Sequence, residues 1–149
     1  MNKEPIPDEI RCRPEVQAVF DKGYVVTFER KTCPSNASVQ EIKMVAHIES
    51  LRLIQRANEH HYTAAHIEHR SVGSFLAEYK ADDGRMVAIN VSVKPDHRRN
   101  GVAKALIVGA ALIAKCKRFA SFNHTDDGRA LLKHCLPVLQ AYGIEVEDD

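Results

Sequence analysis

The residues best suited to chemistry form a basic, glycine-containing stretch in the middle of the chain. Residues 94–104 read Lys-Pro-Asp-His-Arg-Arg-Asn-Gly-Val-Ala-Lys, and an apolar run follows them. A helix that begins near Gly101 would present unpaired backbone N–H groups and a partial positive charge. Gly101 lets the backbone approach a ligand closely, and Arg98 and Arg99 add charge at the same place. The stretch therefore predicts a binding site for a phosphate or pyrophosphate group.

The pattern Arg98-x-x-Gly101-x-Ala103 resembles the acetyl-CoA signature of the GNAT superfamily of N-acetyltransferases. That signature is Gln or Arg, two residues, Gly, one residue, then Gly or Ala, and it follows a strand, as Val93-Lys94-Pro95 suggests here. The resemblance is specific over residues 86–106 and covers about 24–146 in the order of elements. It implies an enzyme that transfers an acetyl group from acetyl-CoA to a primary amine.

The resemblance also implies which residues bind the cofactor. The backbone N–H groups of the turn would hold the pyrophosphate, and the preceding strand would pair with the pantetheine arm. Asn123, at the end of a later strand, resembles a side chain that contacts the pantetheine. The implied cofactor-binding residues are Val91, Ser92, Val93, Arg98, Arg99, Asn100, Gly101, Val102, Ala103 and Asn123.

The general base is not evident from the sequence. Members of the superfamily often carry Glu or Asp on the strand before the signature, and Asn90 occupies that position here. An amide cannot act as a base, but it can hold a water molecule. Glu68, His69 or Glu78 on neighbouring strands could supply the base, although exposed polar residues on strands are usually only solvated.

The general acid is also uncertain. The superfamily often has a tyrosine about four residues before the glycine that ends the late helix, where this chain has Leu139. Tyr142 is the remaining candidate, and the alternative is a tyrosine that closes the edge of the core. Because of Asn90 and Leu139, a catalytically degenerate member that binds CoA or a partner protein is the rival hypothesis. A small α/β binding module unrelated to CoA is a third.

Histidines and cysteines give weaker signals. His60-His61 and the pair His66 and His69 have no third ligand at a fixed interval, so no metal site is predicted. The four cysteines form no C-x-x-C pair and are expected to be reduced. Cys116 lies between two lysines, which could lower its pKa, but a buried thiol is the preferred interpretation.

The elements that must position these residues form an α/β (α+β) fold. We expect a mixed sheet of about six strands, an antiparallel meander plus a parallel splayed pair, flanked by helices and with a shortened C-terminus. The predicted elements are helix 14–22, strand 24–28, helix 38–58, strand 63–70, strands 72–79 and 86–93 joined by a tight turn at 81–84, helix 101–115, strand 119–123, helix 130–142 with a kink or break near residue 134 caused by Pro137, and strand 144–146.

Composition limits the partners. A chain of 149 residues predicts one domain, with residues 1–23 as an N-terminal extension. The net charge of +1 gives no reason to expect nucleic acid. The start of the chain lacks a signal-peptide pattern and its longest apolar run is too short to span a membrane, so a cytoplasmic location is expected. An uncovered C-terminal sheet edge could pair with a second copy.

Overall fold

The computed structural model describes residues 3–55, 62–121 and 126–147 and has a mixed α/β architecture. Its elements are β1 (Glu4–Pro5), α1 (Asp8–Arg11), α2 (Pro14–Asp21), β2 (Tyr24–Cys33), β3 (Asn36–Gln55), β4 (Tyr62–Lys80), β5 (Arg85–Val93), the short 3-10 helix η1 (Pro95–His97), α3 (Val102–Ala114), β6 (Arg118–Ser121), α4 (Asp126–Ala141) and β7 (Glu145–Val146).

The described strands form one seven-stranded sheet whose spatial order is the chain order, β1 to β7. Strands β1 to β5 are antiparallel, whereas β5–β6 and β6–β7 are parallel. Helices α3 and α4 form the two crossovers that the parallel pairs require. The predicted fold class, an antiparallel meander followed by parallel strands, is confirmed.

The prediction of a helix over residues 38–58 is wrong. Residues 36–55 form strand β3, which pairs with β2 and β4. Ile42, Met44 and Ala46 are fully buried, which is the period-two pattern of a strand with one face on the core. The apparent capping residue Ser38 instead donates its backbone N–H to the Asn36 side chain in a turn. Packing on both sides overrides the helical spacing of the apolar residues.

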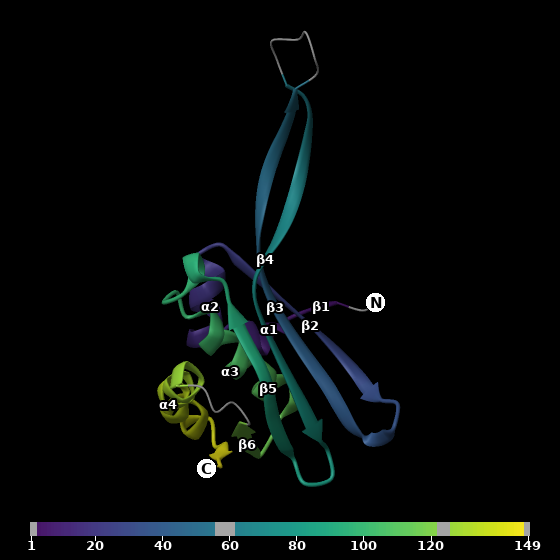
Figure 1. Ribbon diagram of the computed structural model, residues 1–149, viewed down its shortest axis with the longest axis vertical. Coiled ribbons are helices and arrows are strands. Elements are labelled where there is room, and N and C mark those ends of the chain that lie inside the picture. Colours follow the sequence, from purple (N-terminus) through teal and green to yellow (C-terminus); the bar gives the residue numbers. More distant parts are fainter. Residues whose placement is uncertain (1–2, 56–61, 122–125, 148–149) are drawn as a thin grey trace.

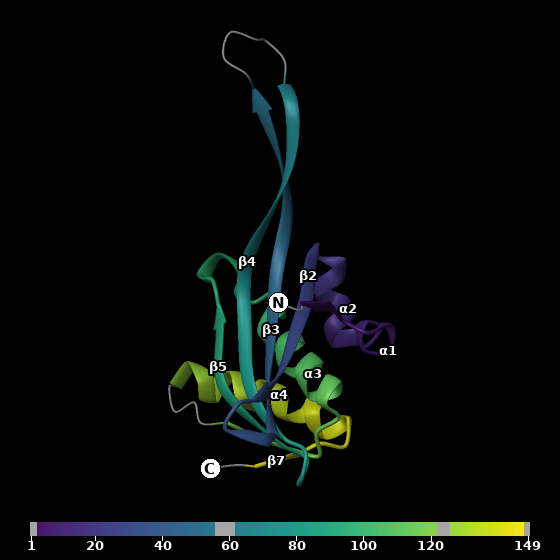
Figure 2. The ribbon, with the colours of Figure 1, turned by 90° about the vertical axis from the view of Figure 1, so that its right-hand side faces the viewer.

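Strands β3 and β4 continue far beyond the rest of the sheet and form a two-stranded arm that projects from the body (Figure 1). The β2 ladder ends at the pair Tyr24 and Ile48, and the β5 ladder ends at the pair Gly73 and Val93. Beyond these pairs, the described parts of β3 and β4 pair only with each other (Figure 2). The expected strand 63–70 is part of this arm.

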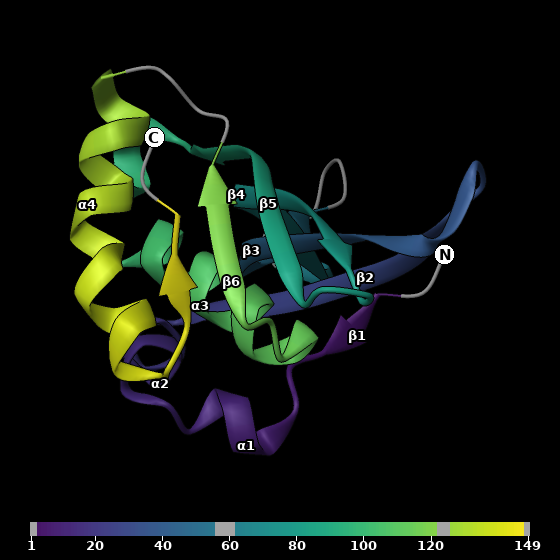
Figure 3. The same cartoon turned by 90° about the horizontal axis from the view of Figure 1, so that it is seen from below.

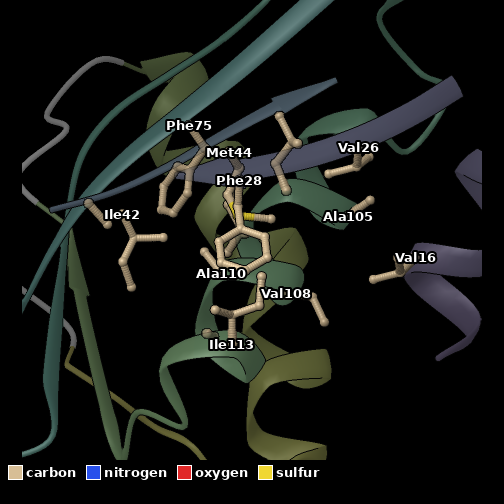
Figure 4. Close-up of a cluster of buried hydrophobic side chains, with 14 of the residues drawn as sticks. Val16, Val26, Phe28, Ile42, Met44, Phe75, Ala105, Val108, Ala110 and Ile113 are labelled. Atoms are coloured by element: carbon tan, nitrogen blue, oxygen red, sulfur yellow. The ribbon is translucent and has the colours of Figure 1, made fainter. Parts of the chain in front are cut away.

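Helix α3 lies at the centre of the structure, against β3, β4, β5, α2 and α4. Ten of its thirteen residues are buried, as its apolar sequence predicts. Figure 3 shows α3 and α4 beside β6 and β7. Figure 4 shows Phe28, Met44 and Phe75 of the sheet gathered over α3 near Ala110. Residues before 23 join the same core through Ile6, Ile10, Val16 and Val19.

The C-terminal elements follow the prediction with one correction. Helix α4 continues through residue 134 and past Pro137 to Ala141, so the alternative of a break is wrong. Gly143 then adopts a φ of +80°, and β7 pairs in parallel with β6. The strand expected at residues 144–146 is therefore present as two residues. Pairing of this edge with a second copy stays a prediction.

Candidate functional site

The basic stretch forms a turn between the end of β5 and the start of α3. Gly101 is the N-cap residue of α3 and has a φ of +78°, in the left-handed region. A Cβ placed on Gly101 would have no atom within 4 Å, so the space in front of the helix is open. The first helical hydrogen bond runs from the N–H of Ala105 to the Gly101 carbonyl, at 3.0 Å. No side chain caps α3, so its first N–H groups point towards this open space.

Positive charges surround the same turn. Arg98 and Arg99 are exposed, and Arg99 also has a positive φ, of 67°. The Arg98 side chain donates from Nε to the Val93 carbonyl at 3.2 Å, which holds its guanidinium close to the end of β5. The Lys22 ammonium donates to the Asn100 carbonyl at 3.0 Å. The helix N-terminus and these cations concentrate positive charge at the turn, on a chain of nearly neutral charge.

Neighbouring elements hold the turn in place. The Tyr24 hydroxyl and His97 Nδ1 lie 2.9 Å apart, and the two rings meet edge to face. The N–H of Lys94 donates to the Val72 carbonyl on β4 at 2.8 Å. Gly73, the next residue on β4, is paired with Val93 and packs closely against β5, because a Cβ on Gly73 would lie 3.1 Å from the Ser92 carbonyl oxygen. The backbone of the turn is thus fixed from β2 and β4.

The edge of β5 carries the predicted pantetheine-binding residues. Strand β6 pairs with β5 over residues 85–88, and β5 continues through 89–93. Ile89 is the extra residue of a β-bulge in the β4–β5 ladder and is 40% exposed. Bulges redirect the backbone and often lie next to functional sites. Val91, Ser92 and Val93 follow the bulge, whereas Asn123 lies outside the described residues.

The structure does not bring the two candidates for proton removal together. Asn90 is exposed on β5 and is paired with Leu76 of β4. Glu68 is paired with Ser50 in the arm and lies eight residues before Leu76 on β4. Eight strand residues correspond to about 26 Å, which side chains cannot bridge. The orientation of the Glu68 side chain lies outside the described part, and its role stays a prediction. Glu78, the other carboxylate considered, is exposed.

Tyr142 is engaged away from the turn. Its hydroxyl donates to the Glu15 carboxylate at 2.6 Å, and Arg13 lies over its ring at 5.5 Å. Burial and the hydrogen bond to Glu15 raise the pKa of Tyr142 to about 12. Glu15 lies in the first turn of α2, whereas Lys22, which contacts the basic turn, follows its last residue. Glu15 and Lys22 are seven residues apart, which corresponds to about 10 Å along the helix axis. A catalytic role for Tyr142 stays a prediction.

One cluster of possible metal ligands was not predicted, and the Cys116 thiol had two alternative interpretations. His47, Glu49 and His69 gather where the arm begins, with ligand-type atoms within 4.8 Å of one another. Burial and the neighbouring His69 lower the pKa of His47. The spacing His47-x-Glu49 could have indicated this cluster, but a helix over residues 38–58 places the two side chains on different faces. Burial raises the pKa of Cys116 to about 11, so the preferred interpretation of a buried thiol is confirmed and the lowered pKa is wrong.

Comparisons with known proteins give similarity among solved structures. No family model and no curated protein matches the chain. Among solved structures, the chain is similar to the apo form of the aminoglycoside antibiotic 6'-N-acetyltransferase AAC(6')-IG from Acinetobacter haemolyticus. The match has 19% identity and a TM-score of 0.30, and it covers 100% of this chain and 94% of that chain. Within the described residues, no helix combines the length and the apolar character that crossing a membrane requires.

Proposed function

We propose that this chain is an N-acetyltransferase that binds acetyl-CoA at the turn of residues 98–103 and transfers its acetyl group to a primary amine. The carrying observation is the N-terminus of α3. A helix of thirteen residues with no side-chain cap begins at a left-handed Gly101 that faces open space, and a short turn joins it to the sheet strand β5. Its N–H groups and the adjacent arginines suit a pyrophosphate. The pattern from Arg98 to Ala103 specifies which pyrophosphate-containing cofactor is expected.

The edge of β5 supports the position of the acyl group. An extended pantetheine arm can pair with the backbone of Val91 to Val93, as an added strand would. The thioester would then lie near the bulge at Ile89, where the ladder is irregular. A backbone N–H there would stabilise the negative charge that develops on the thioester oxygen during attack.

The reaction would proceed by direct attack, without an enzyme-bound intermediate. The amine nitrogen forms a bond with the thioester carbon, the C–S bond breaks, and CoA leaves as a thiolate that takes up a proton. Asn90 is exposed one residue beyond the bulge and can hold the water that accepts the proton of the ammonium group. Most of the rate would come from holding the two substrates in contact.

The test is calorimetric titration of acetyl-CoA into wild type, Gly101→Asp and Gly101→Asn. Asn is nearly the same size as Asp, is neutral, and tolerates a left-handed backbone. The two variants therefore differ mainly in charge. A carboxylate about 4 Å from a phosphate costs about 4 kcal/mol at an effective dielectric constant near 20, or roughly a thousandfold in Kd. We expect micromolar binding by wild type, modest weakening in Gly101→Asn and loss in Gly101→Asp.

Two outcomes would contradict the proposal. If wild type does not bind acetyl-CoA, the acetyltransferase assignment fails. If Gly101→Asp binds as tightly as Gly101→Asn, the turn is not the pyrophosphate site. Where binding is confirmed, an amine screen that monitors free CoA thiol tests transfer. Binding without thiol release from any amine would favour a protein that binds CoA without catalysis.

A further inference from the structure

The base of the β3–β4 arm carries a cluster of side chains that the acetyltransferase proposal does not use. At this point the sheet narrows to two strands, because the β2 ladder ends at Ile48 and the β5 ladder ends at Gly73. His47 lies on β3 just before the narrowing, Glu49 follows two residues later, and His69 lies on β4. The cluster therefore spans both strands at the junction between body and arm.

The strand register places the three side chains on one face. His47 and Glu49 are two residues apart on one strand and so point to the same side. His69 is directly paired with Glu49, which places its side chain on that side too. The His69 Nδ1 and Glu49 Oε1 atoms are 3.6 Å apart, and the two imidazole rings lie 5.3 Å apart between centroids. One ligand-type atom from each of the three residues lies within 4.8 Å of the others.

We propose that His47, Glu49 and His69 bind a divalent transition metal ion of the Zn²⁺ class. Two imidazoles and one carboxylate form a donor set that zinc uses in proteins, whereas Mg²⁺ and Ca²⁺ prefer oxygen ligands alone. The three residues leave the fourth position of a tetrahedral ion to water. The ion links β3 to β4 where a two-stranded ribbon, which is marginally stable alone, leaves the sheet.

The three side chains can coordinate a zinc ion after small movements. Zinc binds nitrogen and oxygen ligands at about 2.0–2.2 Å, so tetrahedral donors lie about 3.4 Å apart. The ligand atoms lie within 4.8 Å of one another, so the widest separation must close by at most about 1.4 Å. The 3.6 Å pair already lies near the tetrahedral separation. The side chains of His69 and Glu49 are 58% and 51% exposed, so both can rotate without disturbing the core. The ammonium of Lys3 acts on His47 and opposes a cation, but Lys3 is itself exposed near the chain terminus.

The experiment uses the full chain without an affinity tag, freed of metal with a chelator. Zn²⁺ is titrated by calorimetry, and Co²⁺ is titrated in parallel because its visible absorption reports tetrahedral coordination. The ligand variants are Glu49→Gln and His69→Gln. The matched controls are His134→Gln, at an exposed histidine on α4, and His66→Gln, on the same strand as His69.

We expect one tightly bound Zn²⁺ per chain in wild type and in both controls. Loss of a residue that only hydrogen-bonds to a metal ligand lowers metal affinity roughly 10- to 100-fold. Loss of a ligand itself should therefore lower metal affinity by at least about 100-fold. Glu49→Gln is the sharper variant, because other histidines in the chain cannot replace its carboxylate. Circular dichroism of the metal-free variants establishes that each one folds.

Three results would overturn the proposal. The first is no binding of Zn²⁺ or Co²⁺ by wild type. The second is unchanged affinity in both Glu49→Gln and His69→Gln, which would place the ion elsewhere. The third is an equal loss in His134→Gln or His66→Gln, which would indicate diffuse binding to the histidines of the chain. None of these readouts uses acetyl-CoA, so metal binding and the proposed enzymatic function can fail separately.

Discussion

Replacing Gly73 with alanine tests whether β4 positions the turn before α3. An added Cβ would lie 3.1 Å from the Ser92 carbonyl oxygen, 3.2 Å from Val102 Cγ1 and 3.3 Å from Val93 Cγ2. The carbonyl is backbone and cannot rotate away, and valine side chains are stiff. Val102 is also only 2% exposed, so it has little room to move. The added methyl group must therefore push β5 and the start of α3 away from β4.

Two opposing effects set the change in the free energy of unfolding in Gly73→Ala. Alanine inside a strand is more stable than glycine by about 0.5–1 kcal/mol, because glycine loses more conformational entropy on folding. Overpacking a well-filled site costs about 1–3 kcal/mol. Since three contacts tighten at once, we expect the second effect to dominate and the free energy of unfolding to fall by about 1 kcal/mol in Gly73→Ala.

Gly109→Ala is the matched control, measured in the same urea denaturation followed by circular dichroism. Its Cβ would meet one atom, the terminal methyl of Met44 at 3.1 Å. That end of an unbranched side chain can rotate, and alanine favours a helix over glycine by about 0.8–1 kcal/mol. The control should match or exceed wild-type stability.

Acetyl-CoA binding provides a second measurement on the same two variants. Gly73→Ala should weaken binding, because the crowded residues border the proposed site, whereas Gly109→Ala should not. The reasoning is refuted if Gly73→Ala is as stable as wild type and binds acetyl-CoA with unchanged affinity.

Two other features give further predictions. Tyr142→Phe should lower the free energy of unfolding by about 1 kcal/mol, because it removes the hydrogen bond to Glu15. Because the pKa of Tyr142 is raised to about 12, its stabilisation is complete below the ordinary value of about 10 and is lost as pH rises towards 12. Urea titrations at several alkaline pH values should show this loss in wild type and not in the variant. Cys116 and Cys135, both buried with pKa values raised to about 11, should react with a thiol reagent only after unfolding, whereas Cys33, whose pKa local hydrogen bonds lower, should react in the native state. Fast reaction of all four thiols in folded protein would contradict this assignment.

Local signals were sufficient where one segment determines its own structure. The reversal at residues 81–84 has an Asp-Gly pair and a left-handed Gly84, and α3 begins where Gly101 predicts it. The prediction for the residues of β3 failed because their apolar positions fit helical and strand spacing at once. The choice between the two depends on pairing with β2 and β4.

The residues of the candidate sites also differ in whether the sequence alone could identify them. The turn that we propose to bind the pyrophosphate is contiguous in sequence, so its residues could be named from the motif. The partner of Tyr142 is Glu15, 127 residues away, and nothing in the sequence indicates that pairing. The cluster at the base of the arm depends on the register between β3 and β4, because Glu49 meets His69 only when both strands are aligned. A helix over residues 38–58 would have pointed His47 and Glu49 in different directions.

One irregularity in β4 contributes to both candidate sites. The register with β3 moves from Ala46 and Gly73 to His47 and Ser71, so Val72 is an extra residue. The Val72 side chain is buried, and its carbonyl accepts the N–H of Lys94 at the start of the basic turn. The same shift sets the pairing beyond it, including that of His69 with Glu49. If Val72 were instead paired with His47 in regular register, His69 would pair with Ser50, and its side chain would lie on the face opposite to His47 and Glu49.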